Sequence, residues 1–189
     1  VGPAIAPVVV SGAMAAAVAA GTGYLLGRSG GYAGATFDWH QRAGIAVVPS
    51  AFAEPGQKAG QALDAFLAKY PDAAEFVVKP SVGAGSRDAQ RYRRAQSTEA
   101  AAHVARLLAD KRSVLMQPYL ASVDEAGETA LMYFNGEFSH AIRKGPLLQV
   151  GEGPTRALFA PEHITARTPG ADELALATAT LAALGPEPL

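Results

Sequence analysis

The sequence predicts an α+β fold in which helices alternate with short strands and at least one strand pair is antiparallel. Hydrophobic residues make up 49% of the 189 residues and charged residues 17%, so the chain has enough apolar side chains for a buried core. From residue 43 onward, helix-like and strand-like stretches alternate. Asn135-Gly136 separates two β-rich runs, as expected for a two-residue hairpin turn. Because of this hairpin, the pattern is not a regular βαβ series.

The strand-like runs are short and apolar or β-branched, and several end at a proline or a turn. They are residues 45–48, 76–78, 114–116, 129–134 and 137–142.

Three stretches have apolar residues at helical spacing. The first, residues 57–69, should end at Pro71. The second should begin at an N-cap formed by Ser97 or Thr98 and close at Lys111-Arg112. The third, residues 172–184, should stop at Gly185-Pro186.

Residues 1–42 differ from the rest of the chain. Residues 8–26 are rich in alanine, valine and glycine, and no charge appears before Arg28. A signal peptide or membrane segment is one interpretation, but no positive charge precedes the run and its glycines make it weakly hydrophobic. A buried or poorly ordered remnant of a larger protein is the alternative that we favour. We therefore expect an atypical segment at 1–42, a first lobe at 43–118 and a second lobe at 119–189.

The charge balance excludes some partner classes. Sixteen basic and 17 acidic residues nearly cancel, so neither nucleic acid nor an anionic membrane is expected as the main partner. The chain has no cysteine, which excludes disulfides, thiolate metal sites and cysteine nucleophiles. This composition is consistent with a cytoplasmic protein.

The first candidate site is a lysine at the end of a strand, followed by a glycine-containing loop. Lys79 can reach phosphate oxygens as a point charge, and glycines let backbone amides approach an anion. The loop residues that would cradle a phosphate are Ser81, Val82, Gly83, Gly85 and Ser86. The loop is not a Walker A motif, because no Gly-Lys-Ser/Thr opens a following helix. The alternative is an exposed lysine beside an ordinary turn.

The second candidate is an apolar strand that runs into a proline-stiffened segment. Such a segment offers backbone groups to the edge of an adenine while its side chains sandwich the ring. Its residues are Met116, Gln117, Pro118, Tyr119 and Leu120. The alternative is a plain apolar strand that ends in proline.

The third candidate is the predicted hairpin with the residues around it. Arg143 and Lys144 stand where a strand ends, so at least one can point into a cleft and bind a carboxylate or a phosphoryl group. His140 is either a general base or, as we favour, a partly buried packing residue. Asp124 and Glu125 lie in a predicted loop, either bound to a ribose hydroxyl or solvated.

In order and spacing these motifs resemble the ATP-grasp superfamily. The chain is similar to its glutathione-synthetase-like branch, and in particular to the O-ureido-D-serine cyclo-ligases of D-cycloserine biosynthesis. The matching motifs are residues 76–86, 116–120, 127–146 and 159–162, within a similarity that covers about residues 43–185.

The resemblance implies roles for the candidate residues. Lys79 would bind the phosphates of ATP, the loop from Ser81 to Ser86 would fold over them, and residues 117–120 would line the adenine pocket between two lobes. Arg143 would face the phosphoryl group or the substrate carboxylate. Enzymes of this kind make an acyl phosphate from ATP and a carboxylate, and an amine then displaces phosphate. ATP, Mg²⁺ and a small amino-acid-like carboxylate are therefore the expected cofactors and partners, and a homodimer is compatible with the family.

The chain also departs from the family pattern. Residues 38–42 contain no lysine that matches the family's first phosphate ligand. The magnesium ligands of the family lie beyond the position of Leu189, and Glu187 is the single carboxylate near it, so we assign no metal ligand and expect a truncated copy. The sequence thus predicts an ATP-dependent carboxylate–amine ligase or cyclo-ligase. The alternatives are a non-catalytic nucleotide-binding remnant or regulatory module, and a plain α+β scaffold.

Overall fold

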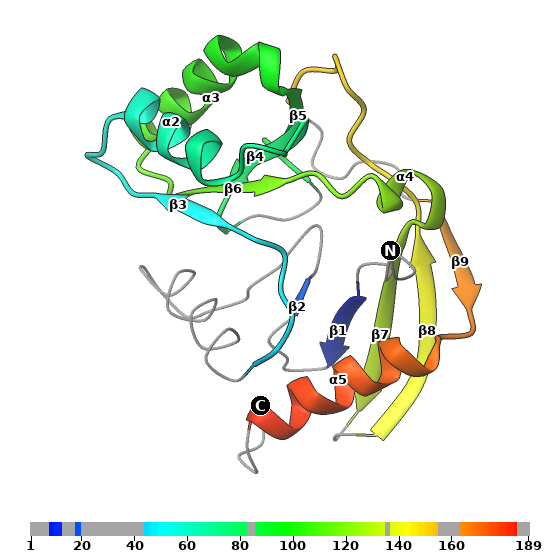
Figure 1. Cartoon of the computed structure of the whole chain (residues 1–189). Coiled ribbons are helices and arrows are strands. Elements are labelled where there is room, and N and C mark those ends of the chain that lie inside the picture. The colour runs from blue at the N-terminus through cyan, green and yellow to red at the C-terminus, as the bar shows by residue number, and fades with distance from the viewer. Residues whose placement is uncertain are drawn as a thin grey trace. The chain divides into compact units, whose positions relative to one another are not determined.

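The computed structural model describes residues 8–12, 18–19, 44–82, 86–134, 137–154 and 163–184, with side chains between residues 44 and 183 (Figure 1). These residues form an α+β structure, which confirms the predicted fold class. In chain order the elements are β1 (Val8–Gly12), β2 (Val18–Ala19), β3 (Ala51–Ala53), α2 (Ala59–Lys69), β4 (Glu75–Pro80), β5 (Gln90–Arg93), a 3-10 turn (Arg94–Gln96), α3 (Ser97–Ala109), β6 (Val114–Pro118), α4 (Ser122–Ala126), β7 (Glu128–Phe134), β8 (Glu137–Lys144), β9 (Ile164–Arg167) and α5 (Ala171–Leu184).

The chain divides into two compact units that interleave along the sequence. We call Val48–Tyr119 with Leu147–Pro161 the helix-pair unit, and Val1–Val47 with Leu120–Pro146 and Glu162–Leu189 the hairpin unit. The functional lobes 43–118 and 119–189 stay a prediction.

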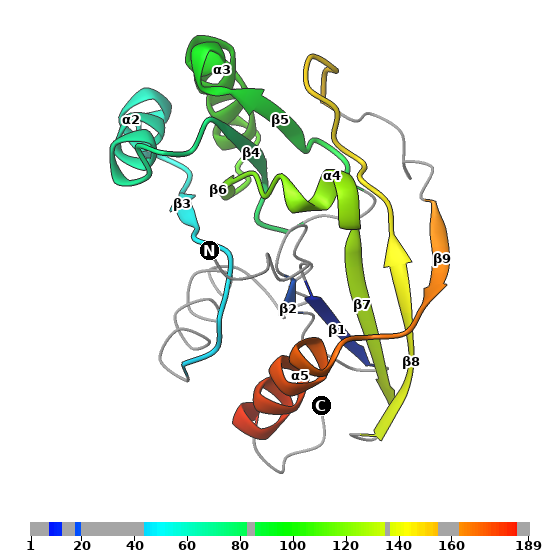
Figure 2. The ribbon, with the colours of Figure 1, turned by 45° about the vertical axis from the view of Figure 1, so that its right-hand side comes forward.

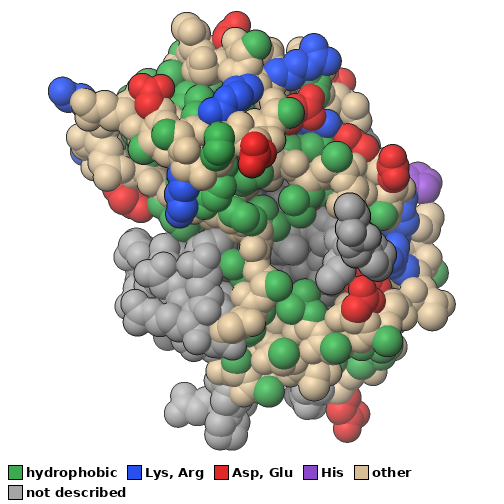
Figure 3. Space-filling model, viewed as in Figure 1, with side chains coloured by type: hydrophobic (Ala, Val, Ile, Leu, Met, Phe, Trp, Pro, Cys, Tyr) green, Lys and Arg blue, Asp and Glu red, His purple; other side chains and the backbone are tan. Residues whose placement is uncertain are grey.

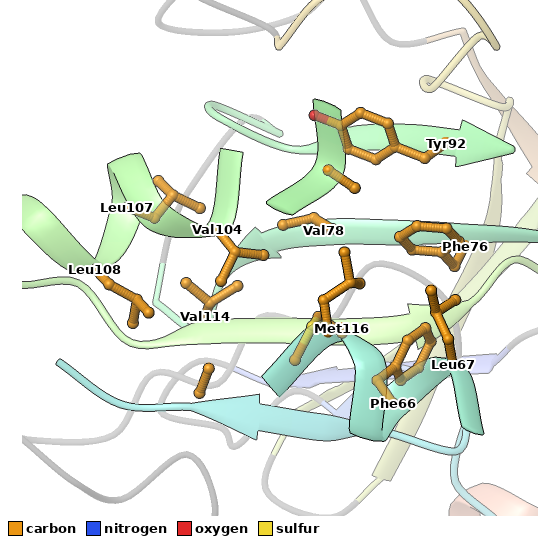
Figure 4. Packing of buried hydrophobic residues seen from close by; sticks show 13 residues of the cluster. Phe66, Leu67, Phe76, Val78, Tyr92, Val104, Leu107, Leu108, Val114 and Met116 are labelled. Carbon is orange, nitrogen blue, oxygen red and sulfur yellow. The ribbon is translucent and has the colours of Figure 1, made fainter. Parts of the chain in front are cut away.

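The helix-pair unit contains a sheet of strand order β3-β6-β4-β5, in which every neighbouring pair is antiparallel. Helices α2 and α3 lie together on one face of this sheet (Figure 1). Side chains from alternate positions of the strands meet the apolar stripes of the helices in one layer (Figure 4). Within it, Phe76 lies between Phe66 and Tyr92, at ring centroid distances of 5.6 and 5.8 Å. Since strand side chains alternate, Val77 points to the opposite face, where it is buried in a smaller apolar cluster with Ala89 and Leu148.

Arg94 joins the two helices of this unit. Its Nη2 donates to the carbonyl of Leu67 at 2.7 Å and its Nη1 to the carbonyl of Tyr70 at 3.1 Å. These carbonyls lie at the C-terminal end of α2, where a helix leaves acceptors without internal partners. The 3-10 turn that precedes α3 therefore also caps α2.

The hairpin unit contains a sheet of strand order β2-β1-β7-β8-β9. β1 is parallel to β7, while β7, β8 and β9 follow one another antiparallel. Helix α5 crosses one face of this sheet (Figure 2), and Ala177 of α5 is buried against Leu131, Tyr133 and Ala141. The hairpin prediction is confirmed for both strands; Asn135-Gly136 lies outside the described residues.

The structure contains the other predicted strands and helices, except for the strand at residues 45–48, and two further details need correction. Residues 45–48 are not a strand; pairing begins at Ala51, beyond Pro49, which has no N–H to donate. Neither Ser97 nor Thr98 is the N-cap of α3, because the preceding 3-10 turn moves the start of the helix to Ser97 with Gln96 as cap. Asp124 and Glu125 lie in α4 and not in a loop. Gly185-Pro186 lies outside the described residues.

Candidate functional site

The candidate site is the face of the helix-pair sheet that α2 and α3 leave uncovered. Met116 and Val78 point into the helix-covered core, so their neighbours Gln117 and Lys79 point to the opposite face. The register pairs Val77 with Gln117 and Lys79 with Leu115, which makes Lys79 and Gln117 diagonal neighbours on that face. The structure thus brings together the predicted phosphate lysine and one residue of the predicted adenine segment.

Lys79 is 6% exposed and is therefore a buried cation, not an exposed lysine beside a turn. A buried ammonium group needs anionic or hydrogen-bonding partners to offset its lost hydration. The adjacent Ser81 is also buried, and its backbone N–H donates to the carbonyl of Ser113 at 2.8 Å, which fixes the start of the loop. Val82 is 61% exposed, while Gly83 and Gly85 lie outside the described residues.

The end of the same loop is fixed by Asp88. Its carboxylate accepts hydrogen bonds from Arg112 Nη1 at 2.6 Å and from Arg106 Nη2 at 3.1 Å. Burial raises the pKa of Asp88, but the hydrogen bonds and charges of Arg112 and Arg106 together outweigh it, and the pKa lies below its ordinary value. Ser86 and Asp88 both have φ of 58°, a left-handed conformation that costs free energy outside glycine. Both ends of the loop are therefore held beside the connection between α3 and β6.

Gln117 carries a hydrogen-bonding group that the described part of the chain leaves unused. The side chain is 4% exposed. Its Nε2 donates to Ser50 Oγ at 2.7 Å, and Ser50 Oγ donates to the carbonyl of Val48 at 3.0 Å. Oε1 of Gln117 is buried and has no hydrogen-bond partner among the described residues. Since an unsatisfied buried acceptor costs free energy, it is a position where a ligand donor would be favourable.

The remaining residues of the predicted adenine segment are placed differently. Met116 is fully buried against the helices, so only its backbone can face a ligand. Tyr119 lies under Arg91, whose guanidinium carbon is 3.5 Å from the ring centroid. Arg91 Nε also donates to Glu75 at 2.9 Å, which holds the cation over the ring. Leu120 begins a segment of the hairpin unit, and Pro118 ends β6.

The hairpin unit holds the other predicted site residues. Arg143 Nε donates to the carbonyl of Ala126 at 2.7 Å and Nη2 to that of Glu125 at 3.1 Å, so Arg143 caps the C-terminal end of α4. Neither of these two bonds uses Nη1. Asp124 is exposed on α4.

His140 is exposed on β8, where its Nδ1 lies 3.1 Å from Ser139 Oγ. Its interpretation as a partly buried packing residue is therefore wrong. The register explains the exposure, because the neighbouring Ala141 pairs with Leu131 and is buried in the α5 cluster, so His140 points to the other face of the sheet.

A buried polar cluster in the hairpin unit was not predicted. Glu173 accepts from Thr129 Oγ1 at 2.6 Å, from Arg167 Nη2 at 2.9 Å and from the N–H of Gly170 at 2.7 Å. Glu173 is a first-turn residue of α5 and no local pattern distinguishes it from a solvated cap. Ser50 was missed for a similar reason, since only its contact with Gln117 makes it part of the site.

The described residues contain neither a metal-binding cluster nor a membrane-spanning helix. No three His, Asp or Glu side chains there gather as they would around a metal ion. None of the helices in that part of the chain is long and apolar enough to cross a membrane. Basic and acidic side chains are interspersed on the face drawn in Figure 3, in line with the net charge of −1.

No family model matches the sequence. The cycloserine biosynthesis protein DcsG of Streptomyces lavendulae is 45% identical over 142 residues, which are 74% of this chain and 46% of the relative. The crystal structure of D-cycloserine synthetase DcsG matches with a TM-score of 0.71 and 43% identity, over 77% of this chain and 48% of that chain. D-alanyl-alanine synthetase A from Vibrio cholerae O1 biovar eltor has the same fold at 12% identity, with a TM-score of 0.51 over 79% of this chain and 45% of that one.

The chain spans about half the length of the relatives that it matches. The similarity to DcsG covers 74% of this chain, and the fold is shared with two solved synthetases. Sequence and fold together show that the chain belongs to the ATP-grasp superfamily.

Proposed function

We propose that the chain binds ATP on the face of the helix-pair sheet opposite α2 and α3 and is part of an ATP-dependent carboxylate–amine ligase. The observation that carries the proposal is the pairing of Lys79, a buried cation, with Gln117, whose buried Oε1 has no partner in the described part of the chain, on one sheet face. An ATP molecule has groups that complement both, since its adenine amino group donates and its phosphates are anionic.

The adenine would lie at the Gln117 end of this face. Oε1 of Gln117 would accept a hydrogen bond from the adenine amino group, and the backbone of residues 118–120 would meet the ring edge. Asp124 is proposed to accept from a ribose hydroxyl.

The phosphates would lie at the Lys79 end. Lys79 supplies the positive charge, and the loop residues Ser81, Val82, Gly83, Gly85 and Ser86 supply backbone N–H and hydroxyl donors. The two held ends of this loop, at Ser81 and Asp88, support the idea, because a loop fixed at both ends loses less conformational freedom when it binds an anion.

The proposed reaction has two steps, in the order that the family resemblance implies. A carboxylate oxygen attacks the γ-phosphorus of ATP, the bond to the β-phosphate oxygen breaks, and ADP leaves. An amine then attacks the acyl carbon, inorganic phosphate leaves, and the amine gives up a proton to form the amide. Arg143 is proposed to bind the substrate carboxylate or the transferring phosphoryl group through Nη1. Since the described residues contain no metal-binding cluster, we derive no step through Mg²⁺.

Nucleotide binding is tested by calorimetric titration of the purified chain with a non-hydrolysable ATP analogue, with and without magnesium. Lys79→Ala should weaken binding by about 1.5–3 kcal/mol, the scale of a charge-assisted hydrogen bond. Lys79→Met keeps the apolar stem and should show the same loss if the alanine variant folds poorly. Lys58→Ala, at an exposed lysine whose side chain makes no cap, is the matched control. Equal affinity of the Lys79 variants and the wild type would eliminate the phosphate role.

The second candidate function is a non-catalytic nucleotide-binding module. The absence of a metal-binding cluster among the described residues favours it. Phosphate release from ATP and Mg²⁺ that depends on an added amino-acid-like carboxylate would establish the ligase. Binding of the ATP analogue without such release over a panel of carboxylates would establish the module.

A further inference from the structure

Ser50 and Gln117 form a hydrogen-bonded pair that joins two strands on the candidate face. Ala51 pairs with Met116 across β3 and β6, so Ser50 lies beside Gln117 at the next position. Their side chains are 2.7 Å apart between Gln117 Nε2 and Ser50 Oγ, and both residues are buried. The backbone of Ser50 is itself held by Tyr70, the C-cap residue of α2, whose Oη donates to the carbonyl of Ser50 at 3.5 Å.

Counting hydrogens fixes the direction of the bonds in this pair. A serine hydroxyl has one hydrogen, and that of Ser50 is donated to the carbonyl of Val48 at 3.0 Å. Only lone pairs of Ser50 Oγ are then left for Gln117, and they require a donor. The amide nitrogen of Gln117 must therefore face Ser50, and its oxygen must face away.

The reversed amide is disfavoured because it would put two acceptor oxygens in contact. Ser50 could donate to the reversed amide only if its hydrogen bond to the carbonyl of Val48 were broken, and that carbonyl would then lose this donor. Oε1 of Gln117 is consequently held as an acceptor with no competing partner among the described residues.

We propose that Ser50 is a positioning residue that sets the base preference of the nucleotide site by fixing the orientation of the Gln117 amide. This inference rests on the proposed ATP-binding function. The adenine amino group is a donor and complements a fixed acceptor, whereas guanine has an acceptor oxygen at the same ring position. Without Ser50, the amide of Gln117 can turn and offer either atom.

The test compares dissociation constants for non-hydrolysable analogues of ATP and GTP, measured by calorimetry on the full chain. The wild type should prefer the adenine analogue. Ser50→Ala should weaken its binding by about threefold to tenfold, the scale of one neutral hydrogen bond, and should reduce the ratio between the two analogues. Ser50→Thr keeps the hydroxyl and should keep the ratio. Ser97→Ala, at the start of α3, is the control for a serine outside the site.

The outcomes separate this inference from the function on which it rests. A wild type that binds neither analogue refutes the proposed function. A wild type that binds both analogues equally, or a Ser50→Ala variant with an unchanged ratio, refutes the role of Ser50 while nucleotide binding stands. If the alanine variant does not fold, Ser50→Cys has nearly the same volume with a weaker hydrogen bond and should reduce the ratio in the same direction.

A second measurement needs no nucleotide. The side-chain amide protons of Gln117, assigned in ¹⁵N spectra by their loss in Gln117→Leu, should exchange slowly with solvent in the wild type and faster in the Ser50 variants. Equal exchange rates would contradict a fixed amide.

Discussion

The two sheets are covered in different ways. In the helix-pair unit, α2 and α3 meet β3, β6, β4 and β5 through one continuous apolar layer. In the hairpin unit, α5 meets β7 and β8 through a smaller apolar cluster that lies alongside the buried carboxylate of Glu173. In the helix-pair unit the larger apolar cluster lies on one face of the sheet, and the other face carries Lys79 and Gln117 beside a smaller cluster of Val77, Ala89 and Leu148. The hairpin unit depends in addition on buried polar groups that are hydrogen-bonded to one another.

The largest expected effect is in the apolar layer. Phe76→Ala removes a ring that contacts both Phe66 and Tyr92, and should lower the free energy of unfolding by about 3–5 kcal/mol through lost burial and an unfilled cavity. Chemical denaturation followed by circular dichroism measures it. Phe134→Ala, at a side chain that is 53% exposed, should change the same quantity much less. Equal losses at the two positions would contradict the apolar layer as the main source of stability.

A smaller change in the free energy of unfolding is expected at the buried hydrogen bonds of Glu173 in the hairpin unit. Glu173→Gln keeps the volume but turns one acceptor into a donor facing either Arg167 or the N–H of Gly170. The free energy of unfolding should fall by about 1–3 kcal/mol, the cost of buried groups left unpaired. Glu137→Gln, at an exposed carboxylate, is the control. A stabilised Glu173→Gln variant would mean that burial of the charge costs more than its three hydrogen bonds return.

A third effect appears only below neutral pH, and it concerns His103, a buried histidine of α3 that contacts Tyr92 of the apolar layer. Burial lowers the pKa of His103 to about 4, with a further decrease from the charge of Arg106, partly offset by Asp88. His103 Nδ1 lies 3.0 Å from Tyr92 Oη, and burial raises the pKa of Tyr92 to about 12. Since an unfolded histidine titrates near 6.5, the unfolded chain binds more protons between pH 6.5 and 4.

The free energy of unfolding should therefore be fully retained above pH 6.5 and should decrease as the pH falls toward 4. Thermal melts across this range measure the decrease, and His103→Asn should flatten it. The lowered pKa of Asp88 adds a loss only at still lower pH, below its unfolded value of 3.8, so the two contributions are separable. The same slope in His103→Asn and the wild type would rule out His103 as the cause.

The sequence predicts the elements whose signal is local. Residues 57–69 and 129–142 carry their periodicity and turn chemistry within a few residues, and α2, β7 and β8 form there. β5 was missed because its arginines give no strand pattern; the strand forms since β4 offers it a partner and Glu75 an ion pair for Arg91. α4 was missed because its C-terminal end is capped by Arg143 from a distant strand.

The candidate site divides in the same way. Lys79 and Gln117 stand in motifs that the sequence displays, and the structure adds that they share one sheet face. Ser50 is 67 residues from Gln117 and has no local signal, so only the register of β3 against β6 reveals it. The pairing of distant strands thus brings together residues whose proximity the periodicity of the sequence does not reveal.

The parallel pairing of β1 with β7 has a consequence for the order in which the chain folds. It joins residues 8–12 to residues 129–133, more than a hundred positions apart, whereas every strand of the helix-pair sheet lies within residues 51–118. Because closing a longer loop costs more entropy and distant contacts form more slowly, the helix-pair sheet should assemble first during synthesis. Until β7 emerges, residues 8–12 lack that partner, and the nascent chain carries an unpaired edge that can recruit other strands.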